Sequence, residues 1–148
     1  MHQFVHQQSR ALSHDEIERF LKEHSYGRLG LAFQNEPYVI PIAYGYEQGK
    51  IYFHSAEQGK KLDFIRKNDS VCFELDEWQK GWASVICYGR VALRDDLEAK
   101  RKCFELLTGQ ELDESRLQSL KVYIGVIQIQ ELTGRCSIDF EFSKAPSN

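Results

Sequence analysis

Hydrophobic and polar residues follow a helical period near the N-terminus and a strand-like pattern after it. Ile17, Phe20 and Leu21 lie on one face of a helix whose other positions are mostly charged. Ahead of this face, Ser13 can cap the helix, and Glu16, three residues later, completes a capping box. The pattern therefore predicts an amphipathic helix that begins just after Ser13.

This helix is predicted to end at residues 25–27, and strand-like runs dominate the rest of the chain. We predict strands over residues 29–33, 38–46, 51–55, 71–75, 84–93 and 123–132, with a further short strand over 138–142. Gly89 is predicted to mark a bulge. Two more helices are predicted over residues 59–67 and 95–107. Connections of turn length between the first three strands imply antiparallel pairing.

About six strands with small helices between them favour a closed or nearly closed antiparallel barrel, because closure removes exposed strand edges. The predicted class is α+β, mainly β. The 148 residues fit a single domain, and no repeat or linker interrupts them. Residues 1–11 are expected to form a flexible arm and residues 143–148 a tail.

Charge and composition limit the partners. A net charge of -3 gives no global positive field to attract nucleic acid or anionic lipid, so an anionic ligand must be held by a local group of cations. The longest apolar runs fall far short of the roughly 20 residues that cross a bilayer. The N-terminus lacks the pattern of a secretion signal, and we expect a soluble, cytoplasmic protein.

No metal site is predicted. Cys72, Cys87, Cys103 and Cys136 are widely spaced, with no Cys-x-x-Cys pair, and we interpret them as reduced and mostly buried. His2 and His6 have a spacing that could bind metal on a helix. We interpret them instead as unligated residues of a mobile terminus.

The segment from Tyr52 to Lys61 is the most informative one for chemistry. A strand ends there in small polar residues and passes through Gly59 into a helix that begins with Lys60 and Lys61. Free helix amides, the Ser55 hydroxyl and the two lysines could together hold a phosphate, although two solvated surface lysines would give the same pattern.

Pro41 lies in the middle of a predicted strand, although proline has no amide donor for a central ladder. One side of this strand is therefore expected to lack a strand neighbour. A flat heterocycle that hydrogen-bonds to the freed backbone would explain this, and so would a simple edge strand.

The order of these segments resembles the flavin-nucleotide-binding proteins related to pyridoxamine 5′-phosphate oxidase, and within them the nitroimidazole-resistance-like branch. The similarity covers roughly residues 12 to 136. It is carried by Tyr26-Gly27-Arg28-Leu29, by residues 37–44 and 51–62, by Ser70 to Glu74, by Ser84-Val85 with Gly89-Arg90-Val91, and by Leu132 to Arg135.

The resemblance implies a split β-barrel whose two protomers hold an FMN in each of two clefts at their interface. It also implies the cofactor contacts: Pro41, Ile42 and Ala43 along the isoalloxazine ring; His54, Ser55, Lys60 and Lys61 around the phosphate; Ser84 and Val85 on a neighbouring strand; and Trp82 and Arg135 from the partner chain. Trp82 could equally be a core or interface aromatic. A homodimer is also expected because ligand sites favour clefts between subunits.

The leading hypothesis for function is an FMN-dependent oxidoreductase that takes electrons from NAD(P)H and reduces a nitroaromatic or quinone-like compound. The flavin would carry the chemistry. His54 could move a proton, but we favour a cofactor contact for it. No Gly-x-Gly-x-x-Gly fingerprint is present, so a nicotinamide would dock transiently.

Alternative functions remain open. The chain could be a non-enzymatic flavin carrier or sensor, it could bind FAD, or it could bind haem through His24 or His54, as some split-barrel relatives do. Pyridoxamine-phosphate oxidase activity is disfavoured, because residues 141–148 lack the Arg-x-His substrate motif of those enzymes.

Overall fold

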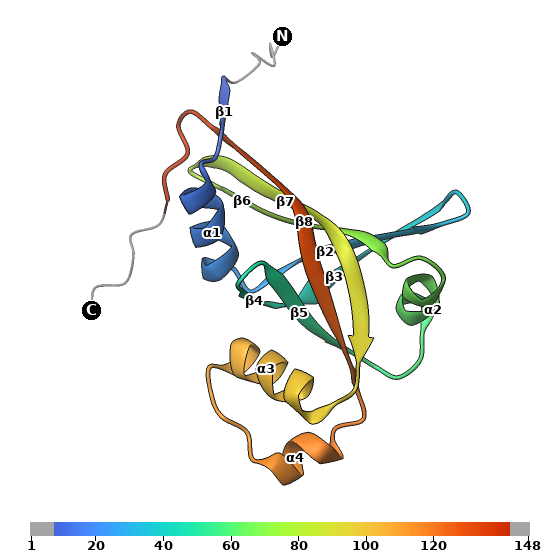
Figure 1. Cartoon of the computed structure of the whole chain (residues 1–148). Coiled ribbons are helices and arrows are strands. Elements are labelled where there is room, and N and C mark those ends of the chain that lie inside the picture. Colours follow the sequence, from blue (N-terminus) through green and yellow to red (C-terminus); the bar gives the residue numbers. More distant parts are fainter. Residues whose placement is uncertain (1–7, 143–148) are drawn as a thin grey trace.

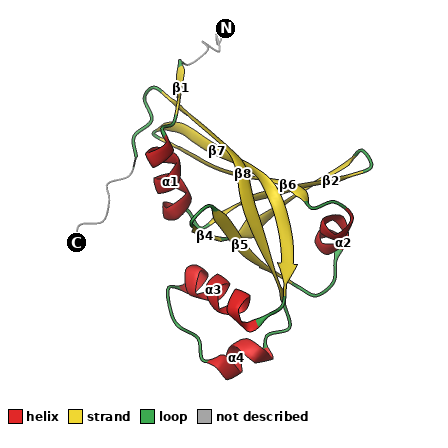
Figure 2. Ribbon diagram, in the orientation of Figure 1, coloured by secondary structure: helices red, strands yellow, loops and turns green. Residues whose placement is uncertain are grey.

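An antiparallel sheet forms the body of the protein, and helices lie against its outside and at its opening (Figures 1 and 2). The computed structural model describes residues 8–142. The strands are β1 (Ser9–Ala11), β2 (Tyr26–Phe33), β3 (Glu36–Ala43), β4 (Gly45–Glu47), β5 (Lys50–Ser55), β6 (Ser70–Gln79), β7 (Gly81–Arg94) and β8 (Tyr123–Ser137). The helices are α1 (His14–Glu23), α2 (Lys60–Lys67), α3 (Leu97–Thr108) and α4 (Glu114–Ser119).

The sheet curls into a barrel that does not close. Its order is β3-β2-β6-β7-β8-β5-β4, with β1 added to β8. The two end strands, β3 and β4, are consecutive in the chain and are joined by Tyr44 alone, so the chain returns from one end of the sheet to the other. Over residues 8–142 no ladder joins β3 to β5, which leaves the barrel split between them. The predicted antiparallel split barrel is therefore confirmed.

The core fills the inside of this barrel. Phe20 of α1, Phe53 of β5 and Phe73 of β6 are completely buried there. The predicted capping box of α1 is present: the Glu16 amide donates to Ser13 Oγ, and the Ser13 amide donates to the Glu16 carboxylate. Arg10 pairs with the same carboxylate at 2.8 Å and, with these bonds, lowers the pKa of Glu16 to about 2. These contacts fix α1 against the barrel.

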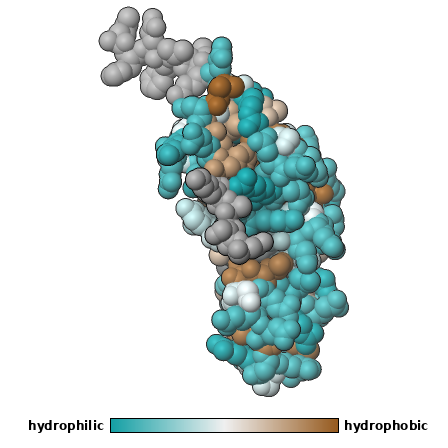
Figure 3. Space-filling view, turned by 90° about the vertical axis from the view of Figure 1, so that its left-hand side faces the viewer, coloured by the Kyte–Doolittle hydropathy of each residue, from teal (hydrophilic) through white to brown (hydrophobic). Residues whose placement is uncertain are grey.

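Helices α3 and α4 form a separate layer outside the lower part of the barrel (Figure 1). The side of the molecule shown in Figure 3 is mostly hydrophilic, with smaller hydrophobic patches. A second apolar cluster joins α3 to β5 and β8 through Tyr52, Ala99, Cys103, Ile124 and Val126. Leu106 of α3 lies so close to Gly45 that a Cβ at this glycine would collide with it. The glycine therefore allows α3 to approach the start of β4.

Several sequence predictions agree with the structure. The register between β7 and β8 shifts between Tyr88 and Gly89, which confirms the bulge. β3 has a strand neighbour on one side only, as the proline indicated. The cysteines are free, and three of the four are buried.

Other predictions need correction. The strand expected over residues 38–46 breaks at Tyr44, whose amide donates to Ser25 O at 3.0 Å instead of joining a ladder. The strand expected over 138–142 is wrong, because the Phe140 amide turns back to Ser137 O at 3.0 Å. Helix α4 was not predicted.

The chain ends are only partly described. The flexible arm expected over residues 1–11 includes Ser9–Ala11, which the structure places in β1, paired with β8. The rest of that arm up to residue 7, with His2 and His6, and the tail at 143–148 lie outside the described residues. Among the described residues, no helix is long and apolar enough to cross a membrane.

Candidate functional site

The split between β3 and β5 is flanked by α2. The rings of Tyr38 on β3 and Phe64 on α2 lie 5.4 Å apart, so the helix packs against the strand that has no ladder on this side. β5 ends at Ser55 and leads into α2. Residues 41–43 of β3, predicted to contact the flavin ring, are here called the ring segment. The structure therefore brings the ring segment and the predicted phosphate-binding residues around the start of α2 to the two sides of one opening.

The start of α2 has no side-chain cap. Gly59 occupies the N-cap position with a φ of 137°, which only glycine adopts without strain, and nothing lies near the position where its Cβ would be. The first amides of the helix are therefore available to a ligand. Ser55 beside them is buried, and its hydroxyl donates to Ala56 O at 3.1 Å.

The two lysines at this helix start differ in their surroundings. Lys60 is exposed, pairs with Glu36 at 3.5 Å and lies over the Tyr38 ring at 4.7 Å. Lys61 is partly buried, and no carboxylate of residues 8–142 lies within ion-pair distance of its ammonium group. Burial lowers the pKa of Lys61, because a buried ammonium group loses its hydration. Within the described part of the chain, Lys61 thus has no carboxylate partner, and its ammonium group lies 5.8 Å from the centre of the Phe53 ring.

His54 lies beside this lysine. Its ring stacks on Phe104 of α3, with 5.4 Å between centroids. Burial against its surroundings lowers the pKa of His54, and the positive charge of Lys61 lowers it further. The exposed His54 side chain and Lys61 therefore lie within electrostatic range of each other, and among the described residues no carboxylate pairs with either. This arrangement suits a bound phosphate, whose negative charge would stabilise both.

The predicted ring segment lies at the end of β3. The side chains of Pro41 and Ala43 are exposed on the outer surface of the barrel, whereas Ile42 points into the core. Pro41 lies opposite Arg28 of β2. A flat ligand against this segment would meet the two exposed side chains and the unpaired edge of the strand.

The remaining predicted residues lie elsewhere on the sheet. Ser84 of β7 lies opposite Arg135 of β8, and Arg135 donates to Ser9 Oγ at 2.8 Å. Trp82 stacks on Trp78, with centroids 6.1 Å apart, and Val85 is fully buried. β7 is three strand spacings from β3, roughly 14 Å along the sheet. Within one chain, Trp82 and Ser84 therefore do not lie next to the ring segment.

The sequence analysis missed a large exposed surface on strands β3, β2, β6 and β7, here called the outer face. It carries four exposed large hydrophobic side chains: Tyr26 (65% exposed), Val39 (64%), Trp78 (71%) and Tyr88 (46%). An apolar groove of about 420 Å³ runs over Gly30, Val39, Cys72 and Tyr88. Alternation along each strand could have revealed this face once the inward positions were known.

A charged cluster interrupts the outer face. Arg28 pairs with Glu74 at 3.3 Å and with Asp76. Burial and the neighbouring Asp76 raise the pKa of Glu74 to about 7, so this carboxyl loses its proton less readily than an ordinary glutamate. Three charged groups so close together are costly to cover unless they stay paired.

The comparisons with known proteins point to one family. Residues 13–136 match the model of a family described as pyridoxamine 5′-phosphate oxidase. An uncharacterized protein of Rhizobium meliloti (strain 1021) is 28% identical over 96 residues, which are 64% of this chain. The chain spans 61% of the length of that curated relative.

Two solved structures share the fold. A protein of Bacteroides thetaiotaomicron described as a 5-nitroimidazole antibiotic resistance protein has a TM-score of 0.77 and 21% identity, over 87% of both chains. An FAD-binding protein of Mesorhizobium loti has a TM-score of 0.72 and 28% identity, over 87% of this chain and 98% of that one. At 21% identity, the match to the Bacteroides structure shows that the two proteins share a fold and shows nothing about function.

The electrostatic influence of Lys61 on His54 generates a testable prediction. In the variant Lys61→Met, the pKa of His54 should rise but stay below its ordinary value of about 6.5, because burial remains. Histidine-ring NMR titration of the ligand-free protein measures this. Lys60→Met, which removes the lysine paired with Glu36, serves as the control and should leave the pKa of His54 unchanged. An unchanged value in the Lys61 variant would contradict this electrostatic influence.

Proposed function

Because this chain belongs to the pyridoxamine 5′-phosphate oxidase family, we propose that it binds FMN in the split of its barrel and acts as a flavin-dependent oxidoreductase. The proposed donor is NAD(P)H, and the proposed acceptor is a nitroaromatic or quinone-like small molecule. The observation that supports the proposal is that Lys61, His54 and the uncapped start of α2 lie around the end of β5, where they could hold an anion.

The phosphate of the cofactor occupies this anion site. Lys61 supplies the charge that lacks a counter-ion, and the first amides of α2 donate hydrogen bonds at the positive end of the helix. The phosphate also raises the pKa of His54 by offering its imidazole an anion. His54 is a cofactor contact in this arrangement, with proton transfer as its weaker alternative role.

The ring of the cofactor lies against Pro41, Ile42 and Ala43. The free edge of β3 supplies backbone donors and acceptors that no strand uses. A bound flavin supplies two-electron transfer, and the protein holds the ring in place and excludes water. FAD is a second possibility for the cofactor, because a solved structure 28% identical to this chain is that of an FAD-binding protein.

The partner in the proposed assembly is a second copy of the chain. Exposed apolar groups on the outer face favour association, since burial of apolar surface is the main driving force for it. Trp82, Ser84 and Arg135 lie too far from their own ring segment to contact the same flavin. In a symmetric dimer they reach the partner's flavin instead.

One route to the haem alternative, ligation by His24, is weakened by the structure. As a haem ligand, His24 has no free nitrogen: Nδ1 donates to Phe20 O at 2.8 Å, and Nε2 lies 3.2 Å from Glu77 Oε2. A non-enzymatic flavin carrier would use the same phosphate site, so only turnover separates it from an oxidoreductase.

The phosphate site predicts different effects on two related ligands. Lys61→Met should weaken FMN binding by roughly 10- to 100-fold, since a charge-assisted hydrogen bond contributes about 1.5–3 kcal/mol. Riboflavin, which lacks the phosphate, should bind the variant as it binds the original protein. Quenching of flavin fluorescence measures both affinities. Equal losses for FMN and riboflavin would argue against a phosphate contact.

Turnover tests the reaction itself. The protein loaded with FMN and separated from excess cofactor should oxidise NADH or NADPH when a nitroaromatic or a quinone is added, as followed by nicotinamide absorbance. It should release no hydrogen peroxide with pyridoxamine 5′-phosphate. Retention of FMN without any nicotinamide oxidation would leave the carrier or sensor as the better description.

The mass of the protein in solution, and variants of residues on the outer face, test the proposed dimer. Light scattering after gel filtration should give twice the chain mass at micromolar concentration. Val39→Glu should shift the protein towards the monomer, because it would bury an unpaired charge in the interface. Ile138→Glu, at an equally exposed position outside the outer face, should remain dimeric. A monomeric original protein would remove both the dimer and the shared site.

A further inference from the structure

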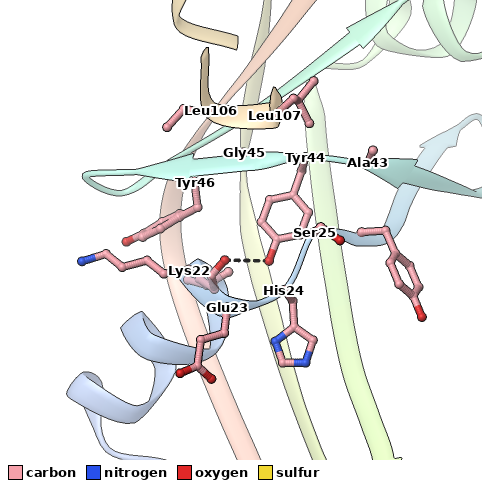
Figure 4. A pocket seen from close by; sticks show the side chains of 12 residues that line it. Lys22, Glu23, His24, Ser25, Ala43, Tyr44, Gly45, Tyr46, Leu106 and Leu107 are labelled. Carbon is pink, nitrogen blue, oxygen red and sulfur yellow. Dashed lines mark hydrogen bonds between the residues drawn. The ribbon is translucent and has the colours of Figure 1, made fainter. Parts of the chain in front are cut away.

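A second cavity, of about 530 Å³, adjoins the end of the ring segment. It lies between the end of α1, the turn from β3 to β4, and the end of α3 (Figure 4). Ala43, the last residue of the ring segment, is one of its lining residues. The volume falls within the range of sites that bind small molecules.

The upper wall of this cavity is apolar. Leu106 and Leu107 of α3 lie above the segment from Ala43 to Gly45, where β3 passes into β4 (Figure 4). Tyr44 adds an aromatic ring from the other side of this segment, and its hydroxyl is already used, since it donates to Leu21 O at 2.7 Å. These walls favour an apolar, planar occupant.

The polar side chains of the lower wall are paired with protein groups. Lys22 is the one lysine or arginine among the described residues that line the cavity, and it lies 3.8 Å from Glu18. Glu23 pairs with Arg19 at 2.7 Å, and the His24 ring is held between Phe20 O and Glu77. The cavity thus has no unpaired cation to hold an anionic ligand.

Two hydroxyl groups at the cavity are still available. Neither the Ser25 hydroxyl nor the Tyr26 hydroxyl has a hydrogen-bond partner within the part of the chain that is described. They can bind a carbonyl, nitro or amide group of a ligand without any change in charge.

We propose that this cavity binds an uncharged aromatic compound and places it beside the flavin ring at Ala43, and that it rejects anionic analogues. This proposal rests on the proposed flavin site. It adds that the electron acceptor at that site is uncharged. Among the described residues, the carboxylate of Glu23 lines the cavity and its one lysine, Lys22, already pairs with Glu18, so an anion there would meet a like charge and no free cation. Pyridoxamine 5′-phosphate, with its phosphate dianion, is therefore disfavoured.

The test compares two probes of nearly the same shape, neutral 4-nitrobenzamide and anionic 4-nitrobenzoate. NMR of leucine methyl groups follows binding of each to the FMN-loaded and the flavin-free protein. We expect 4-nitrobenzamide to shift the methyl signals of Leu106 and Leu107 and to bind at least about tenfold more tightly than 4-nitrobenzoate. Equal or tighter binding of 4-nitrobenzoate would overturn the proposal.

Two variants of one lining residue locate the site. Leu107→Trp fills the cavity and should weaken binding of 4-nitrobenzamide at least about tenfold, whereas Ile138→Trp, at an exposed position away from the cavity, should not. Leu107→Lys keeps most of the space but adds a cation, and it should shift the preference toward 4-nitrobenzoate. Unchanged selectivity in a Leu107→Lys protein that melts normally would also overturn the proposal.

The design separates this inference from the proposed cofactor. Loss of FMN retention with intact binding of 4-nitrobenzamide to the cavity would overturn the proposed flavin site and, with it, the placement beside the ring. Intact FMN retention without binding at Leu106 and Leu107 would overturn the cavity assignment alone.

Discussion

Backbone hydrogen bonds join seven strands of this protein into one continuous sheet, and this pairing is interrupted between β3 and β5. The interruption follows from Tyr44, where the chain leaves one end of the sheet and begins the other. α2 packs beside the opening through Phe64, and the free edge of β3, the end of β5 and the start of α2 all lie around it. Each part of the candidate site therefore depends on the same missing ladder.

The cation at this opening differs from others in its surroundings. Some described cations, such as Arg10 with Glu16 and Arg90 with Asp69, have a carboxylate partner, and others do not, but burial lowers the pKa of Lys61. Lys61 is partly buried without a carboxylate partner among the described residues and lies beside His54. Binding sites often contain a charge that is unfavourable while the site is empty, because the ligand supplies the compensating charge.

The sequence was sufficient for features with a local cause. The capping box at Ser13, the bulge at Gly89 and the edge position of the strand with Pro41 each follow from the chemistry of one or two residues, and the structure agrees. Sequence reasoning could not separate Lys60 from Lys61, because their difference comes from Glu36 and from burial in the folded chain. It also missed the cavity at Leu106 and Leu107, which three distant segments form together.

The gap in the ladder also affects how long the folded chain persists. Local opening is easiest where strands lack backbone partners, and proteases cleave the opened form. A ligand seated across the gap would tie β3 to the segment around α2 and would favour the closed form by mass action. The abundance of such a protein in a cell would then follow the supply of its ligand, so that starvation for the ligand lowers the amount of protein as well as its occupancy.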